Sequence, residues 1–178
     1  MFSNRPNIKV SPTTGERWLN RLSIILIISV FGYVAQRFNT LPDTIPIHFD
    51  GKGNIDGWGH KGTIFIVPSI MTVMFIGLYF LNKIPHTYNL PVKITELNAA
   101  KIYSMSRTMM ALFNFEMVLI LAYTTYAIIA SANEGVSLLA AWYIVTISIG
   151  PLGTIIIYSF VMRRVAHQLD SDKLNQID

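Results

Sequence analysis

Residues 138–162 read LLAAWYIVTISIGPLGTIIIYSFVM and contain no charged side chain. A helix needs about 20 residues to cross roughly 30 Å of hydrocarbon, so this stretch is long enough to span a membrane. Residues 62–82 are also free of charge, and in residues 108–133 the only charged side chain is Glu116. Three transmembrane helices are therefore predicted, at residues 63–82, 108–131 and 138–162.

A fourth apolar stretch lies near the N-terminus, between Arg21 and Arg37. Both arginines can extend their charges toward the polar surfaces from the ends of a helix over residues 18–38. A cleavable signal peptide is the alternative, but bulky side chains follow the stretch where a cleavage site needs small ones. We therefore expect an uncleaved helix, and the predicted fold class is an all-α integral membrane protein with four transmembrane helices.

The composition agrees with this fold class. Of 178 residues, 52% are hydrophobic and 13% are charged, whereas an ordinary soluble domain is about 25% charged. The chain has no cysteine, which excludes a disulfide scaffold, a cysteine-ligated metal and a thiol nucleophile. The high hydrophobic fraction and the low charged fraction also disfavour a cytosolic enzyme.

The distribution of lysine and arginine predicts the orientation. Eleven of the 14 basic residues lie in or beside the tail at 1–17, the loop at 83–107 and the tail at 163–178. Basic residues are enriched on the cytoplasmic side, so we expect a multi-pass protein of the cell membrane with both termini in the cytoplasm. In the loop, an amphipathic helix is predicted over residues 92–107, either lying on the membrane surface or extending the third span.

The outer segment between the first two spans, residues 39–62, reads NTLPDTIPIHFDGKGNIDGWGHKG. Ile45, Ile47 and Phe49 alternate with other residues, as is typical of a strand, and the glycine-containing run at 50–54 has the composition of a tight turn. A short β-hairpin is therefore predicted in an ordered extracellular loop. Loops that carry many specific residue types on a rigid frame are often functional.

Two interpretations of this segment follow from its residue types alone. A transition metal could bind at His48 and His60 with nearby aspartates, although their spacing matches no short metal motif. In the structural interpretation, His48 and Trp58 cap the helices, while Asp56 pairs with Lys61 or with a backbone turn. No metal or other cofactor is expected in the favoured interpretation.

The segment also carries a pattern of fixed residues. It runs LPxxIPxHF and continues with an acid, a glycine, an aspartate, a tryptophan and a lysine, here Leu41, Pro42, Ile45, Pro46, His48, Phe49, Asp50, Gly53, Asp56, Trp58 and Lys61. This pattern resembles a bacterial membrane domain of unknown function shared with SdpI-type immunity proteins. The resemblance implies protection of a Gram-positive producer from its own secreted peptide toxin, or signalling by sequestering a repressor at the membrane.

On this basis we predict a non-enzymatic protein that recognises an extracellular peptide or lipid headgroup. The predicted ligand-binding residues are His48, Phe49, Asp50, Asp56, Trp58 and Lys61. The expected partners are membrane lipid, a secreted peptide toxin outside and a regulatory protein inside; nucleic acid is not expected, and an oligomer is compatible with the sequence. The main alternative is a membrane enzyme that uses the histidine and aspartate cluster, with or without a metal.

Glu116 is the remaining candidate, because an acid inside a span costs about 2.5 to 3.5 kcal/mol and is functional by default. It could serve a small transporter. It could equally join two helices through a hydrogen bond, with Asn114, Tyr79 or Ser148 as the expected partner.

Overall fold

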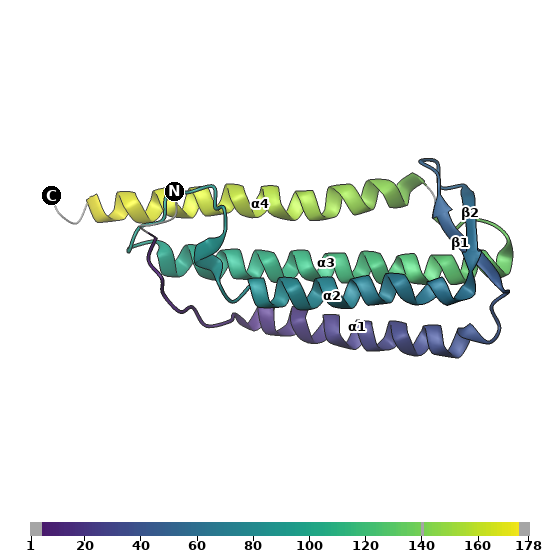
Figure 1. Ribbon diagram of the computed structural model, residues 1–178. Helices are drawn as coiled ribbons and strands as arrows, with labels where there is room; N and C mark the ends of the chain where they lie inside the picture. Colours follow the sequence, from purple (N-terminus) through teal and green to yellow (C-terminus); the bar gives the residue numbers. More distant parts are fainter. Residues whose placement is uncertain (1–4, 140, 175–178) are drawn as a thin grey trace.

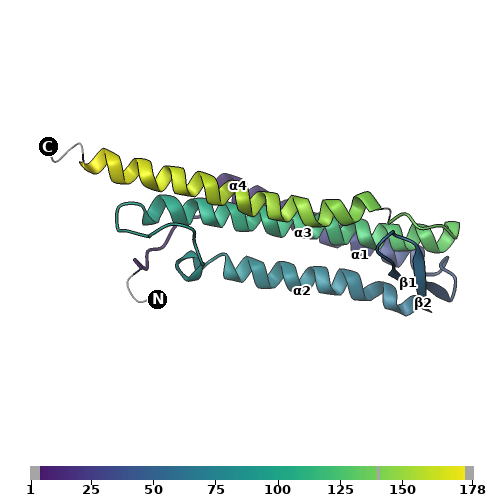
Figure 2. The ribbon, with the colours of Figure 1, turned by 90° about the horizontal axis from the view of Figure 1, so that it is seen from above.

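The computed structural model describes residues 5–139 and 141–174, whose helices lie side by side with a small sheet at one end (Figures 1 and 2). The helices are α1 (Thr14–Phe38), α2 (Ile66–Leu81), α3 (Ala99–Glu134) and α4 (Ala141–Leu174). Four helical segments in this part of the chain are long and apolar enough to cross a membrane. The predicted fold class, a four-span helical membrane protein, is confirmed.

The helix ends follow local sequence signals. Thr13 caps α1, since its Oγ1 accepts a hydrogen bond of 3.1 Å from the backbone amide of Glu16. Helix α3 ends at Glu134 and is capped by Gly135, which has the left-handed φ of 71° that glycine tolerates without strain. A 3-10 turn, η1 (Lys61–Phe65), leads from the sheet into α2.

Helix α3 is the centre of the bundle, and α1, α2 and α4 each pack against it. The core between α1, α2 and α3 contains Val34, Met71 and Val118, all fully buried. Large apolar residues cover the outside, where Val73 of α2 is 71% exposed and Ile156 of α4 is 65% exposed. An apolar exterior is what a hydrocarbon solvent requires, so the arrangement indicates a multi-pass membrane protein.

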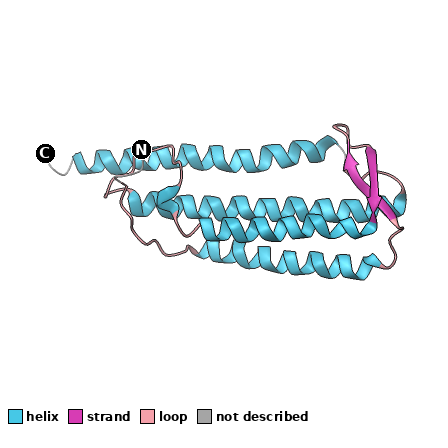
Figure 3. Ribbon diagram, viewed as in Figure 1, coloured by secondary structure: helices cyan, strands magenta, loops and turns pink. Residues whose placement is uncertain are grey.

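The sheet is a two-stranded antiparallel hairpin of β1 (Thr44–Phe49) and β2 (Ile55–His60), drawn in magenta in Figure 3. The predicted hairpin is confirmed. The described chain begins and ends at the opposite end of the bundle, as an even number of spans requires (Figure 1). The hairpin therefore lies across one membrane surface, and we refer to the other end as the terminal end.

The helix predicted over residues 92–107 forms only in part, and that part extends the third span. Residues 92–98 are irregular, and residues 99–107 are the first turns of α3. Asn98 explains the late start, because its side chain accepts a hydrogen bond from the amide of Thr95 and donates one to the carbonyl of Lys93. Such local bonds to the backbone compete with helix formation.

Candidate functional site

The hairpin brings together two of the predicted ligand-binding residues, His48 of β1 and Asp56 of β2. Their Nδ1 and Oδ1 atoms are 2.5 Å apart, and the side chains are 71% and 46% exposed. An irregular register between Pro46 and Phe49 places His48 opposite Gly57. We call His48, Asp56 and the neighbouring Trp58 the hairpin triad.

Trp58 is 53% exposed, and exposure alternates along β2 so that Asp56, Trp58 and His60 are its exposed residues. The residues between them are small. A Cβ atom on Gly57 would lie 2.7 Å from the Cβ of His48, closer than real Cβ contacts allow. Glycine at position 57 therefore lets the two strands approach closely enough for His48 to reach Asp56.

Asp50 has a structural role in the turn that joins the strands. Its carboxylate accepts hydrogen bonds of 2.8 Å from the amides of Lys52 and Asn54 and one of 2.9 Å from Nδ2 of Asn54. Gly53 completes the turn with a positive φ of 87°. The bonds from Asn54, with a smaller effect from Lys52, hold the pKa of Asp50 below its ordinary value of 3.8.

This lowered pKa predicts how the turn responds to acid. Because the pKa of Asp50 is lower in the folded protein than in the unfolded chain, its ionised carboxylate stabilises the fold at pH values above 3.8, the ordinary pKa. This stabilisation is lost as the pH falls through the lowered pKa of the folded protein. In the variant Asn54→Ala the pKa of Asp50 should rise toward 3.8, because the hydrogen bond from the Asn54 side chain is the largest cause of the lowered pKa. A carboxyl titration by NMR measures it, and an unchanged midpoint in the variant would contradict the assignment.

Phe49 and Lys61, also predicted to bind ligand, connect the hairpin to the helices. Phe49 packs against the buried clusters around α3 and the α3–α4 connection. The Nζ of Lys61 lies 3.0 Å from the carboxylate of Asp43 and 5.7 Å from the ring centre of Phe38 in α1. The structural interpretation that paired Asp56 with Lys61 is therefore wrong, since Asp56 contacts His48 instead.

The two outer histidines do not form a common site. Nδ1 of His60 accepts a hydrogen bond of 3.0 Å from the amide of Gly62 and so caps η1. Within residues 5–139 and 141–174, no group of three or more histidine and acidic side chains is arranged to hold a metal ion. The hairpin therefore positions one histidine and one aspartate, and not a metal cluster.

Glu116 lies at the contact between α3 and α4, where Thr154 donates a hydrogen bond of 2.5 Å to its Oε1. The three partners expected from the sequence were Asn114, Tyr79 and Ser148. Asn114 instead donates to the carbonyl of Phe75 in α2. The buried Oε2 of Glu116 has no hydrogen-bond partner among the described residues, and the bond to Thr154 favours a role in helix packing.

Sequence reasoning missed a buried ion pair at the terminal end. Arg107 of α3 bonds Glu16 of α1 through Nε–Oε2 at 3.1 Å and Nη2–Oε1 at 2.7 Å, with side-chain exposures of 10% and 4%. The same guanidinium donates to the carbonyl of Val10. The sequence feature that could have indicated this ion pair is Glu16, an isolated acid in a basic tail.

Comparisons with known proteins find a match to a domain of unknown function and a match to an uncharacterised archaeal protein. Residues 24–72 match the model of a domain of unknown function, DUF1648. This segment runs from the middle of α1 through the hairpin into α2. An uncharacterised protein of Archaeoglobus fulgidus is 30% identical over an alignment of 125 residues that covers 65% of this chain and 67% of that protein. No solved structure matches the chain.

Proposed function

Because this chain belongs to the family of the uncharacterised Archaeoglobus fulgidus protein and carries a DUF1648 domain at residues 24–72, we propose that its hairpin is a receptor surface for a membrane-active peptide. The observation that supports this is that one part of the hairpin is buried against the helices while another part is exposed. Ile45, 1% exposed, is in the core, while the hairpin triad is presented to solvent. A rigidly held, exposed surface of this kind suits recognition.

A peptide fits this surface because β2 offers an unpaired edge. Within the described residues the sheet has two strands, so β2 pairs with β1 on one side only. An extended peptide can add to such an edge through main-chain hydrogen bonds, with adjacent side chains giving selectivity. Trp58 would contribute apolar contact, and the His48–Asp56 pair would contribute polar contact.

Catalysis by the His48–Asp56 pair is the competing function. The short contact between the two side chains is suitable for acid–base chemistry. Enzymes, however, exclude water from such a pair to strengthen its electrostatic effects, and these side chains are 71% and 46% exposed. The exposure favours recognition, which in a producing organism would give immunity to its own secreted toxin.

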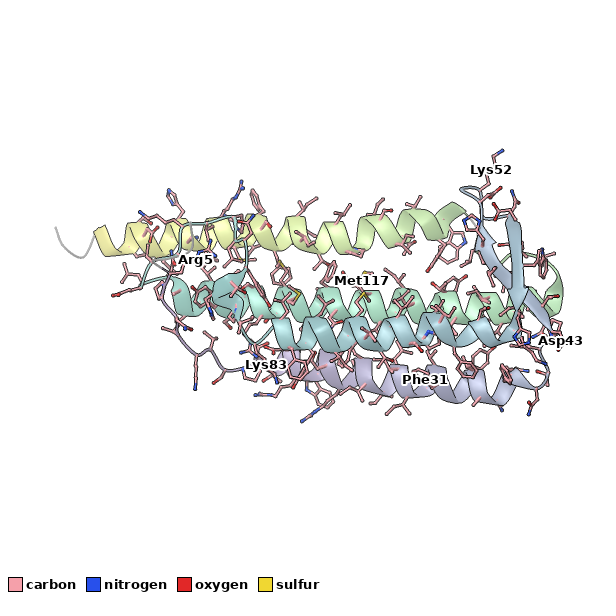
Figure 4. All side chains as sticks on the ribbon, in the orientation of Figure 1. Arg5, Phe31, Asp43, Lys52, Lys83 and Met117 are labelled. Atoms are coloured by element: carbon pink, nitrogen blue, oxygen red, sulfur yellow. The ribbon has the colours of Figure 1, made fainter. Side chains whose placement is uncertain are left out.

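The test is survival of a sensitive bacterium that expresses the chain and is challenged with secreted membrane-active peptides. Wild type should protect, whereas His48→Ala and Trp58→Ala should lose protection because each removes part of the triad. Lys52→Ala, at the hairpin tip (Figure 4), is the matched control and should protect fully. All four forms must reach equal membrane levels. Equal protection by all four would refute the role of the triad.

A further inference from the structure

A cavity of about 600 Å³ lies between α1, α2 and α3. Its lining residues belong to the terminal end of the bundle, the end opposite the hairpin (Figure 1). Its lining comes from Pro12 and the first turns of α1, the second half of α2 with Lys83 after it, and Arg107 of α3. The volume falls in the range of about 300 to 1,000 Å³ that is usual for small-molecule sites. Neither the peptide-receptor function nor the hairpin triad uses this cavity.

The charges around the cavity are strongly unbalanced. Arg107 is neutralised by Glu16, which leaves Arg17, Arg21 and Lys83 as the charged side chains in excess. Arg17 is oriented by hydrogen bonds of 3.2 Å to the carbonyl of Pro12 and 3.0 Å to the hydroxyl of Thr14. Three cations beside a low-dielectric wall attract an anion more strongly than the same charges in water.

Aromatic rings hold the other two cations near the cavity. The guanidinium of Arg21 lies 5.3 Å from the ring centre of Trp18. The ammonium of Lys83 lies 4.6 Å from the ring centres of both Tyr79 and Phe80. Figure 4 shows Lys83 at this end of the bundle. Such contacts restrict flexible side chains, which lowers the entropic cost of binding a ligand.

The cavity changes from charged to apolar along the helix axes. Arg21 is followed one turn deeper in α1 by Ile24, which also lines the cavity. Lys83 follows the end of α2 at Leu81, and Phe75 lies six residues before that end, about 9 Å deeper at 1.5 Å per residue. A charged outer part above an apolar inner part matches a phospholipid, whose phosphate lies at the surface and whose chains extend inward.

We propose that this cavity binds the headgroup phosphate of an anionic phospholipid. Arg21, Lys83 and Arg17 contact the phosphate, and an acyl chain lies against Ile24 and Phe75. Basic pockets between transmembrane helices on the cytoplasmic side bind anionic headgroups for the same reason. The bound lipid would join α1 to α2, which pack less closely with each other than either does with α3.

The experiment uses the full chain in a neutral detergent at about 0.15 M salt. The thermal unfolding midpoint is measured against dioctanoyl phosphatidylglycerol, dioctanoyl phosphatidylcholine and inorganic phosphate, since a ligand of the native state raises the midpoint. The test variant is Arg21→Gln with Lys83→Gln, two exposed side chains at the cavity. The control is Lys9→Gln with Lys101→Gln, also exposed and outside the cavity lining, with the same loss of charge.

Phosphatidylglycerol should raise the midpoint of wild type, and phosphatidylcholine should not. The test variant should bind phosphatidylglycerol about 25-fold more weakly, at roughly a fivefold loss for each removed cation. The control should change by less than about twofold, because its charges are screened over about 8 Å at this ionic strength. Equal weakening in both variants, or inorganic phosphate binding as tightly as the lipid, would overturn the proposal. If the test variant unfolds without ligand, Lys83→Gln alone replaces it.

Discussion

The variant Arg107→Met is expected to unfold about 3 to 5 kcal/mol more easily than wild type, the usual effect of breaking a buried ion pair. Removing the guanidinium leaves the Glu16 carboxylate 4% exposed without its two charge-assisted bonds. It also releases the carbonyl of Val10, which Arg107 holds. Unfolding of the full chain by a denaturing detergent, followed by circular dichroism, measures the difference.

A double variant separates the charge effect from packing. Arg107→Met with Glu16→Leu removes both charges, and such replacements of buried pairs are often neutral. The double variant should therefore recover most of the stability that Arg107→Met loses. A loss below about 1 kcal/mol in the single variant, the value typical of an exposed pair, would show that the contact is not a buried pair.

If the hairpin is the proposed receptor surface, Gly57→Ala is expected to abolish protection by disrupting the hairpin while the four helices remain folded. The new Cβ would meet the Cβ of His48 at 2.7 Å, and that atom cannot rotate away without moving β1. Overpacking of this kind costs about 1 to 3 kcal/mol, and it separates His48 from Asp56. Hydrogen exchange of the β1 and β2 amides should accelerate in this variant.

Gly51→Ala is the matched control for Gly57→Ala. Position 51 lies in the same hairpin turn, and an added Cβ there meets nothing within 4 Å. Its amide exchange and its protection should equal those of wild type. If Gly57→Ala behaves in the same way as Gly51→Ala, the close approach of the strands is not required for function.

The sequence was sufficient to predict the helices and the hairpin, because both depend on local patterns. Uncharged stretches of about 20 residues indicate spans, and the glycine-containing run at 50–54 indicates a turn. The start of α3 was not predictable in the same way. It depends on Thr95 and Asn98, whose side chains bond the backbone instead of continuing the helix.

Pairings between distant side chains could not be predicted. The partner of Asp56 depends on the irregular register after Pro46, which places His48 within reach of it. Glu116 accepts its bond from Thr154 of α4, a pairing that depends on how α4 is aligned along α3. Glu16 and Arg107 are 91 residues apart in the chain, and no local pattern relates them.

The distance in sequence between Glu16 and Arg107 has a consequence for synthesis of the protein in the cell. At about 5 to 20 residues per second, a ribosome needs roughly 5 to 20 s to add the residues that separate them. Throughout that interval the first helix can enter the bilayer but cannot form its anchoring contact. The ion pair between α1 and α3 therefore forms only after the ribosome has added Arg107.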